Sequence, residues 1–378
     1  MKSFFMLLAL LFTVHSLCPA LEHPDSLADE NDVRSGQSTV QTETDTSTKR
    51  LSMAGYPVIL YTPETSLIFG GGAALTMRDP NRHRNTRPDN LIFYAIYTLK
   101  NQSAVLFNPD IYFDEDSWQL KMMSVYQKFP DLFYGIGNNT ASEDAEDVTT
   151  EDVIIQPGLT RRIYKNLRFG VMYHLNHTSV QKIEPNGILS SGGLPGSRGS
   201  FLSGMGPIID WDSRDNIFYP SKGSWFQFYA TIYRDWLGSE FEYESYTFDF
   251  RHFIALHDRH ILGLQLFVKS MNGTIPFNHL AQLDLLRGIH ANRFREQNIA
   301  VALIEYRYPV HKRFSGVIFT GIGDVMHRFR DFQLNESKYS IGGGLRFAVI
   351  PDEKINLRFD VGFSRYGIHP YFQLSEAF

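Results

Sequence analysis

The sequence predicts an all-β fold, an antiparallel transmembrane β-barrel of about sixteen strands that follows a short disordered leader. Strand-like alternation of apolar and polar residues carries this prediction. It is clearest from Ile355 to Phe363, where Arg358 and Asp360 lie between apolar neighbours. Because successive side chains of a strand point to opposite faces, both charges must face a polar interior. A barrel that is apolar outside and wet in its lumen provides that interior.

The length of the apolar runs is the second observation. Beyond the N-terminus the sequence contains no uninterrupted apolar stretch of the roughly 18 to 20 residues that a membrane helix needs. A closed sheet is then the only structure left that can span a membrane. The formal net charge is -5 and no basic block occurs, which argues against nucleic acid as a partner.

The N-terminus is the third observation. Residues 1–20 have the features of a secretory signal peptide, with a lysine ahead of the apolar run Phe4–Val14. A lipoprotein signal at Cys18 is the alternative. Residues 21–54 are rich in Asp, Glu, Ser and Thr and have few large apolar side chains, so we expect a disordered periplasmic leader. The barrel is then expected to span residues 55–378.

The strand signals follow one another along this barrel region. Each is a run of alternating residues bounded by Gly, Pro, Asn, Asp or Ser. The first eight are expected at residues 56–62, 66–77, 90–99, 103–112, 116–128, 151–163, 168–180 and 200–212. The second eight are expected at 223–235, 241–256, 260–271, 297–308, 314–324, 337–349, 354–364 and 368–378.

Connection lengths predict the orientation in the bacterial outer membrane, because such barrels have short periplasmic turns and long outer loops. The short connections 164–166, 257–259, 309–312 and 351–353 are consistent with a periplasmic N-terminus and C-terminus. The long connections 129–150, 181–199, 272–296 and 325–336 then lie outside.

No catalytic motif is recognisable in the sequence, so we expect neither an enzyme nor a cofactor or metal site. The histidines around residues 257–260 are expected in a tight turn. The acidic residues Glu143, Asp144, Glu146 and Asp147 are expected in a solvated outer loop. Binding of divalent cations at the lipopolysaccharide surface is the alternative for this loop.

The run Leu286-Arg287-Gly288-Ile289 resembles the (V/I)RG(F/Y) loop signature of the outer-membrane assembly superfamily that includes BamA and TamA, the bacterial surface antigen family. The resemblance implies that this loop folds into the lumen and that Arg287 pairs with acidic residues on the next two strands, Glu305 and Asp324. A guanidinium in a partly desolvated lumen needs a carboxylate. The alternative is a solvated Arg287 beside ordinary polar residues of the lumen.

Other segments also resemble this family. Asp212–Gly223 is similar to a periplasmic turn, and Gly70–Gly72 lies in a segment like the opening hairpin. These glycines either make the first strand easier to separate from the last or accommodate a bulge or a crowded lumen. The final segment resembles the C-terminal signal of outer-membrane barrels, with Phe372, Leu374 and Phe378 on one face, and Glu376 is expected on that face too.

Two functions remain open at this point. One is insertion or translocation of proteins through a weak seam between the first and last strands. The other is a structural barrel, a channel or a membrane anchor for a partner. The leader is too short and too polar for a POTRA domain, which favours the second. Expected partners are outer-membrane lipid and lipopolysaccharide, and either the assembly machinery or a client protein.

Overall fold

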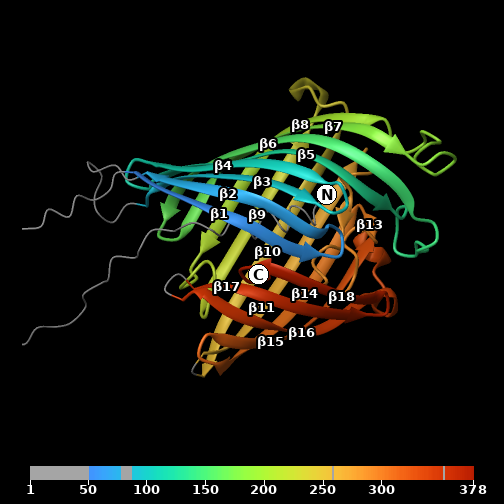
Figure 1. The fold of residues 1–378 in the computed structure, drawn as a ribbon. Coiled ribbons are helices and arrows are strands. Elements are labelled where there is room, and N and C mark those ends of the chain that lie inside the picture. Colours follow the sequence, from blue (N-terminus) through green and yellow to red (C-terminus); the bar gives the residue numbers. More distant parts are fainter. Residues whose placement is uncertain (1–50, 78–86, 258, 352–353) are drawn as a thin grey trace, which may run out of the picture.

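The computed structural model describes residues 51–77, 87–257, 259–351 and 354–378. The predicted signal peptide and residues 21–50 of the predicted leader lie outside this part of the chain. Sixteen antiparallel strands close into one barrel (Figure 1), which confirms the predicted fold. Within the described residues, no helix is long and apolar enough to cross a membrane.

The strands of the first half match the predicted ranges closely. They are β1 (Leu51–Thr62), β2 (Ser66–Met77), β3 (Asp89–Thr98), β4 (Ser103–Phe113), β5 (Trp118–Phe133), β6 (Glu146–Tyr164), β7 (Leu167–Ile183) and β8 (Gly199–Asp212). β1 begins at Leu51, ahead of the predicted start of the barrel at Gly55. β5 and β6 extend into the predicted loop 129–150, so Glu146 and Asp147 belong to a strand.

The second half contains β9 (Gly223–Tyr233), β10 (Tyr243–His257), β11 (His260–Gly273), β14 (Asn298–His311), β15 (Phe314–Met326), β16 (Lys338–Ile350), β17 (Ile355–Ser364) and β18 (Gly367–Leu374). β12 (Ala281–Gln282) and β13 (Arg295–Glu296) pair with each other inside the connection between β11 and β14. Three short 3-10 turns, η1 (Asp235–Leu237), η2 (Phe329–Asp331) and η3 (Leu334–Glu336), lie in other connections. The predicted strand 368–378 is shorter than expected, because β18 stops at Leu374.

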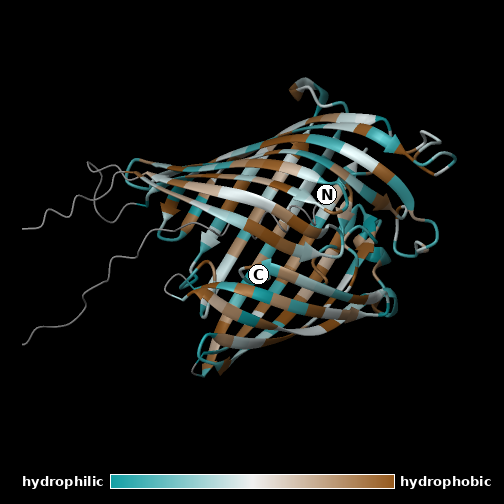
Figure 2. Ribbon diagram, viewed as in Figure 1, coloured by the Kyte–Doolittle hydropathy of each residue, from teal (hydrophilic) through white to brown (hydrophobic). Residues whose placement is uncertain are grey.

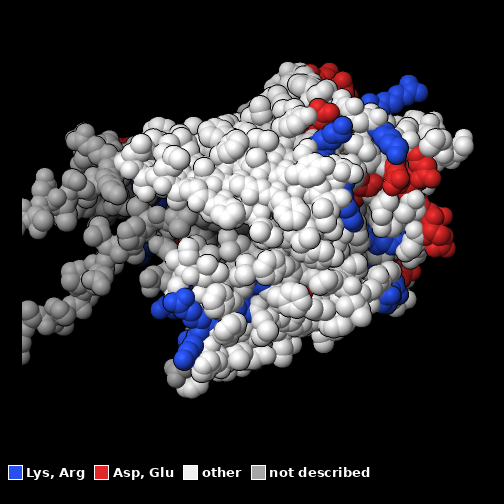
Figure 3. All heavy atoms as spheres, in the orientation of Figure 1, with Lys and Arg blue, Asp and Glu red and all other residues white. Residues whose placement is uncertain are grey.

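The outer face of the barrel is apolar, as the alternation along the strands requires. Residues such as Ile304, Ile318 and Ile341 are 47%, 53% and 60% exposed on this face. Brown and teal residues alternate along the strands in Figure 2. Charged side chains gather toward the two ends of the face shown in Figure 3, and the band between them is almost free of charge. Such a band fits the hydrocarbon layer of a membrane.

The lumen face is of two kinds. Over the central part of β1 to β4 it is apolar, and these residues pack in one cluster that includes Val58, Leu60, Ile68, Ile92, Tyr94, Ile96, Ala104 and Leu106. Toward the end at which β1 begins, the same wall carries the buried polar residues Thr76, Asn90, Asn108 and Asp110. On β14 to β17 the lumen face carries buried charges, namely Glu305, Arg307, Arg346, Arg358 and Asp360. The lumen is therefore not uniformly polar, because the central part of the wall β1–β4 is apolar on both faces.

Crowding of this apolar lumen explains one of the glycines of β2. A Cβ atom added to Gly72 would lie 2.6 Å from the ring of Tyr94 and 2.7 Å from the ring of Tyr56. Gly70–Gly72 pair with β1 residue by residue, without a bulge. Of the alternatives from the sequence, the crowded lumen is the one that the structure supports.

The two edges of β1 are paired very differently. Along one edge, every residue from Leu51 to Thr62 is paired with β2. Along the other edge, the described residues contain one registered pair with β18, between Tyr61 and Phe372. The two strands diverge toward the end of the barrel at which β1 begins (Figure 1). The closure between β1 and β18, which we call the seam, is therefore the weakest junction of the barrel wall.

Candidate functional site: a lumen clasp beside the seam

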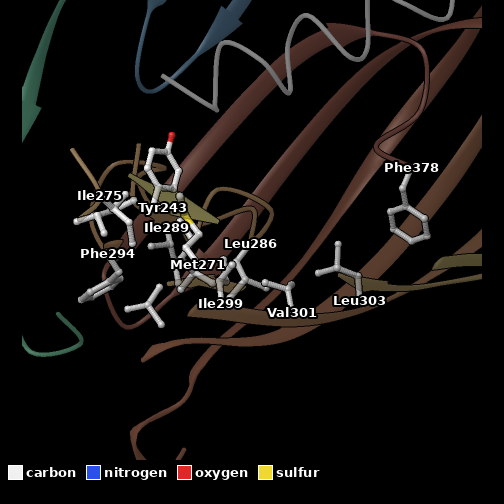
Figure 4. Packing of buried hydrophobic residues seen from close by; sticks show 14 of the residues in the cluster. Tyr243, Met271, Ile275, Leu286, Ile289, Phe294, Ile299, Val301, Leu303 and Phe378 are labelled. Carbon is white, nitrogen blue, oxygen red and sulfur yellow. The ribbon is translucent and has the colours of Figure 1, made fainter. Parts of the chain in front are cut away.

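The connection between β11 and β14, residues 274–297, returns into the barrel, and we call it the clasp loop. Its apolar residues Leu283, Leu286 and Ile289 are buried in a cluster with the lumen side of β14. Figure 4 shows Leu286 and Ile289 beside Ile299 of β14. Hydrophobic burial therefore holds the loop inside the lumen and brings Arg287 to the wall.

Arg287 connects two strands that are not neighbours in the sheet. One Nη atom lies 2.7 Å from a carboxylate oxygen of Glu305 on β14, and the other lies 2.6 Å from Asp360 on β17. The Cζ atom of Arg287 lies 3.4 Å from the centre of the Phe319 ring. Two ion pairs and a stacked ring offset the desolvation of a guanidinium that is only 4% exposed. Arg287, Glu305 and Asp360 form what we call the clasp.

Gly288 fits the loop against β17 in a way that another residue cannot. Its φ is +106°, and an added Cβ would lie 2.8 Å from the carbonyl carbon of Gly362. The Gly288 N–H donates to the Tyr371 hydroxyl at 3.0 Å, and the Ser364 hydroxyl donates to the Gly288 carbonyl at 2.6 Å. The motif thus bonds the loop to both β17 and β18, next to the seam.

Asp324 does not join the clasp, contrary to the expectation from the sequence. Its carboxylate lies 3.5 Å from the ammonium of Lys338 on β16. The reason is the position along β15: the Phe319 ring contacts Arg287, and Asp324 lies five residues further along the strand, about 16 Å away at roughly 3.3 Å per residue. Asp360 takes its place as the second carboxylate. The sequence contained a signal for this residue, because its alternating strand already placed Asp360 in the lumen.

The clasp continues into a larger group of buried charges, which we call the ion cluster. Arg346 donates to Asp360 through Nη1 and to Glu376 through Nε, the latter at 2.6 Å. Arg358 lies 3.9 Å from Asp360 and donates to the side chain of Gln373. Sequence reasoning did not single out Arg346. Nothing in the alternation of β16 shows that its partners come from β17 and from the residues after β18.

Arg307 joins the cluster to the end of the barrel at which β1 begins. Its Nε donates to Glu305 at 2.8 Å, and its two Nη groups donate to the backbone carbonyls of Pro220 at 3.3 Å and Phe378 at 2.9 Å. The guanidinium also lies 5.1 Å from the centre of the Tyr219 ring. One arginine thus holds β14, the turn between β8 and β9, and the residues after β18 together.

The turn Asp212–Gly223 is held by its own polar residues, as a structural turn should be. Asp215 accepts backbone N–H groups from Ser221 at 2.8 Å and from Lys222 at 3.2 Å. Partial burial works against ionisation of Asp215, but the hydrogen bonds from Ser221 and Lys222 outweigh it and lower the pKa of the carboxyl. The turn therefore offers Arg307 a fixed carbonyl group.

The residues of the predicted C-terminal signal do not share one face. Phe372 and Leu374 lie on β18, whereas Phe378 lies beyond the strand, 5% exposed, in the buried cluster of the lumen and beside Phe253. Glu376 is expected from the sequence on the same face as these residues, but it is 5% exposed and pairs with Arg346. The segment turns inward because a buried arginine satisfies its carboxylate and lipid cannot.

Metal ligands do not gather in the part of the chain that the structure describes: no group of three or more His, Cys, Asp or Glu side chains there could hold an ion. Glu146, from the acidic stretch, instead accepts backbone N–H groups of Ile188 and Leu189. This carboxylate anchors the connection between β7 and β8 on the strand.

Comparison with known proteins places the chain in a family. The family model described as the Omp85 superfamily domain matches residues 97–365, well over half of the chain. The chain belongs to the Omp85 superfamily. It is therefore an outer-membrane β-barrel of the assembly and translocation kind, and members of this superfamily are insertion or translocation factors and are not known as enzymes. No curated protein sequence matches the chain.

Solved structures of this superfamily barrel agree with the fold. BamA from Haemophilus ducreyi lacking POTRA domains 1–3 is similar at a TM-score of 0.61 and 13% identity, over 86% of this chain and 70% of that one. CdiB from Acinetobacter baumannii has a TM-score of 0.54 and 11% identity, over 86% and 60%. CdiB from Escherichia coli has a TM-score of 0.54 and 10% identity, over 85% and 62%. At such identities the likeness shows the fold alone.

Proposed function

We propose that this Omp85 barrel inserts or translocates client proteins at the outer membrane through the seam between β1 and β18. The observation that carries the proposal is the single registered pair across the seam, Tyr61 with Phe372. The seam-facing backbone groups of β1 between Leu51 and Leu60 have no ladder partner among the described strands. Such an edge in lipid is costly, so an incoming strand that pairs with it is strongly favoured.

The clasp holds one side of the seam in place. Arg287 fixes β14 to β17, and Gly288 fixes the clasp loop to β17 and β18. Strand β18 is thereby held in place while β1, bonded to β2 alone over most of its length, can move with the apolar wall β1–β4. In this proposal β18 is the fixed border of the seam and β1 is the movable border.

Orientation and partners complete the proposal. We place both ends of the chain in the periplasm, with residues 1–20 as a cleaved signal and the residues from 21 to the start of β1 at Leu51 as a leader ahead of the barrel. Membrane lipid and lipopolysaccharide surround the apolar band. A secreted or inserted client approaches the seam from the periplasm, either alone or delivered by the assembly machinery.

A crosslink across the seam tests the function. We would introduce Tyr61→Cys with Phe372→Cys, whose Cα atoms are partners in the sheet, and follow the folding of a client barrel into vesicles that contain the protein. Insertion should be lost when the cysteines are joined and should return on reduction. The control pair, Phe93→Cys with Phe107→Cys, joins β3 to β4 on the outer face and should have no effect. Full insertion with the seam joined would refute the proposal.

Conductance separates this function from the alternative of a channel. The clasp loop and the ion cluster occupy the lumen with buried side chains, so planar bilayers should show small and brief openings. A large and stable pore would favour the channel instead.

A further inference from the structure

A groove lies on the outer face of the barrel, close to the connection between β15 and β16. It crosses three strands that lie side by side in the wall (Figure 1), at Thr320 of β15, Ile341 of β16 and Phe363 of β17. Tyr339 forms its upper border, and Ile341 and Phe363 are 60% and 44% exposed. The groove is mainly apolar and continues the apolar band of the outer face, so lipid borders it.

The connection between β15 and β16, residues 327–337, reaches the upper border of this groove. The Tyr339 hydroxyl, on the outer face, donates to the Leu334 carbonyl at 3.0 Å. The buried ammonium of the preceding residue, Lys338, donates to the Glu336 carbonyl at 2.9 Å. Two successive residues of β16 therefore hold the connection against the wall, one from each face of the sheet.

This connection exposes large apolar side chains next to arginines. Phe329, Phe332 and Leu334 are 48%, 46% and 61% exposed. Arg328 and Arg330 are exposed within the same stretch. A cluster of exposed apolar side chains marks a contact site, because water is an unfavourable neighbour for it. Phenylalanine and leucine combined with arginine are typical of segments that lie in the surface of a membrane. The connection therefore has the composition of a lipid-surface contact.

The arginines indicate the headgroup of the lipid. Arg365, in the turn between β17 and β18, is also exposed and directly follows a residue that lines the groove. The acids of the connection are Asp331 and Glu336. Asp331 accepts the backbone N–H of Arg328 at 3.0 Å, and its other oxygen lies 3.8 Å from Arg330 Nε, beyond hydrogen-bond distance. Guanidinium groups match the geometry of phosphate, so a phosphorylated headgroup fits here.

We propose that the groove and the connection above it form a lipid site that binds one molecule of lipopolysaccharide. An acyl chain of its lipid A lies in the groove at Ile341, and a phosphate group lies at Arg328 and Arg330. Lipopolysaccharide carries phosphate groups above acyl chains in the outer leaflet, where the proposed orientation puts residues 327–337. The inference rests on this orientation, which is part of the proposed function, but not on client insertion, since a barrel that is only a channel or an anchor would bind the lipid in the same way.

Titration with lipid A tests the site. The purified, folded barrel in neutral detergent micelles would receive increasing lipid A, and native mass spectrometry would count the lipid molecules that stay bound. The parent should bind one lipid A at least fivefold more tightly than phosphatidylglycerol or dephosphorylated lipid A. Arg328→Gln and Arg330→Gln should each weaken lipid A binding by about fivefold, the usual contribution of one basic residue beside an anionic lipid. The control is Lys182→Gln, at an exposed lysine near the end of β7, which should leave the affinity unchanged.

Thr320→Phe tests the groove separately from the arginines, because its ring occupies the space of the acyl chain. It should weaken binding of lipid A and of dephosphorylated lipid A alike, each by about fivefold through lost van der Waals contacts. The arginine variants should affect lipid A alone. The matched control is Ile318→Phe, on the same face of β15 but outside the groove, which should change neither affinity. Altered gel migration of the unheated protein identifies any variant that has not folded.

The outcomes separate the two proposals. Weaker lipid A binding with Arg328→Gln, Arg330→Gln and Thr320→Phe, and unchanged binding in the two controls, supports the lipid site. Unchanged binding in the folded arginine variants, or an equal loss in either control, would overturn it. Equal affinity for phosphatidylglycerol would show a general phosphate contact and overturn the assignment to lipopolysaccharide. Failure of the seam crosslink to stop client insertion would instead refute the proposed function and leave the lipid result valid.

Discussion

The wall β1–β4 and the wall β14–β17 lie on opposite sides of the seam but are built differently. On the central part of β1–β4 the lumen face carries apolar side chains such as Leu60, Tyr94 and Leu106. On β14–β17 it also carries buried arginines and carboxylates, and Arg287 of the clasp loop bonds across them to Glu305 and Asp360. Apolar contacts are not directional, so they can be replaced by others when one strand shifts past another. Buried ion pairs are stable only when donor and acceptor keep their relative positions.

The difference teaches which border of the seam can move. A shift of β1 with β2 trades one set of apolar contacts for another at small cost. A shift of β17 or β18 breaks charged hydrogen bonds between buried groups, which is costly. The two walls should therefore respond to different substitutions, and the following four predictions test this from the largest effect to the smallest.

Reversing the charge of Arg287 should have the largest effect. Arg287→Glu leaves Glu305 and Asp360 beside a third carboxylate, so the free energy of unfolding should fall by about 3–5 kcal/mol or more. Urea titration followed by tryptophan fluorescence measures this. Arg330→Glu, at a side chain that is 72% exposed, is the matched control and should stay within about 0.5 kcal/mol.

A compensating change sharpens this prediction. Adding Glu305→Arg to Arg287→Glu restores one opposite-charge pair and should recover part of the lost stability. The recovery should be incomplete, because Arg307 then loses its carboxylate partner. Strictly additive effects of the two substitutions would contradict a direct pairing.

The stability of the apolar wall should depend on side-chain volume, as the stability of the ion cluster depends on charge. Leu106 is fully buried, so Leu106→Ala should cost about 2–5 kcal/mol, and Leu106→Met less than about 1.5 kcal/mol. The same urea titration applies. Arg287→Met, which also keeps most of the volume, should be far more harmful than Leu106→Met. Equal costs for the two methionine variants would remove the distinction between the walls.

The next effect concerns Gly288, where φ and close packing both require glycine. Gly288→Ala should cost about 1–3 kcal/mol through the left-handed conformation, with a further loss from the contact with Gly362. Gly137→Ala is the matched control, because Gly137 has a φ of +116° and no atom within 4 Å of an added Cβ. The difference in unfolding free energy between the two variants isolates the close packing. No difference would show that the loop does not press against β17.

The smallest effect is a pH dependence in the turn between β8 and β9. The pKa of Asp215 is lower in the folded chain than its unfolded value of about 3.9, so its contribution to stability is present above that value. The contribution is lost as the pH falls through the folded pKa. Asp215→Asn should therefore be less stable than the parent at neutral pH and nearly equal to it in acid. A difference that does not change with pH would contradict the role of the ionised carboxylate.

Local patterns in the sequence predicted most of the barrel. Two-residue alternation and turn residues gave all sixteen strands, and the loop motif brought Arg287 and Glu305 to attention. Asp360 on β17 was missed as a partner of Arg287. Alternation shows that a side chain faces the lumen, but it does not show how far along the barrel axis or how far across the lumen that side chain lies. Asp324 was favoured by resemblance, although it lies too far along β15 to reach Arg287 and pairs with Lys338 instead.

The apolar lumen of β1–β4 and the inward turn after β18 could not be predicted in this way. Apolar residues on both faces of a strand show that both faces are buried, without showing what lies on the second one. The course of Ser375–Phe378 depends on Arg307, Arg346 and Gly263, which are distant in sequence. Local alternation therefore favoured a continued strand, and tertiary contacts decided against it.

Hydrogen–deuterium exchange of the backbone amides of β1 tests the central claim most directly. In an antiparallel strand alternate N–H groups point to opposite neighbours. Between Leu51 and Leu60, the amides that face β2 should exchange slowly, and those that face the seam should exchange fast, while β14 is protected on both edges. Uniform protection along β1, equal to that of β14, would show a closed seam and contradict the account.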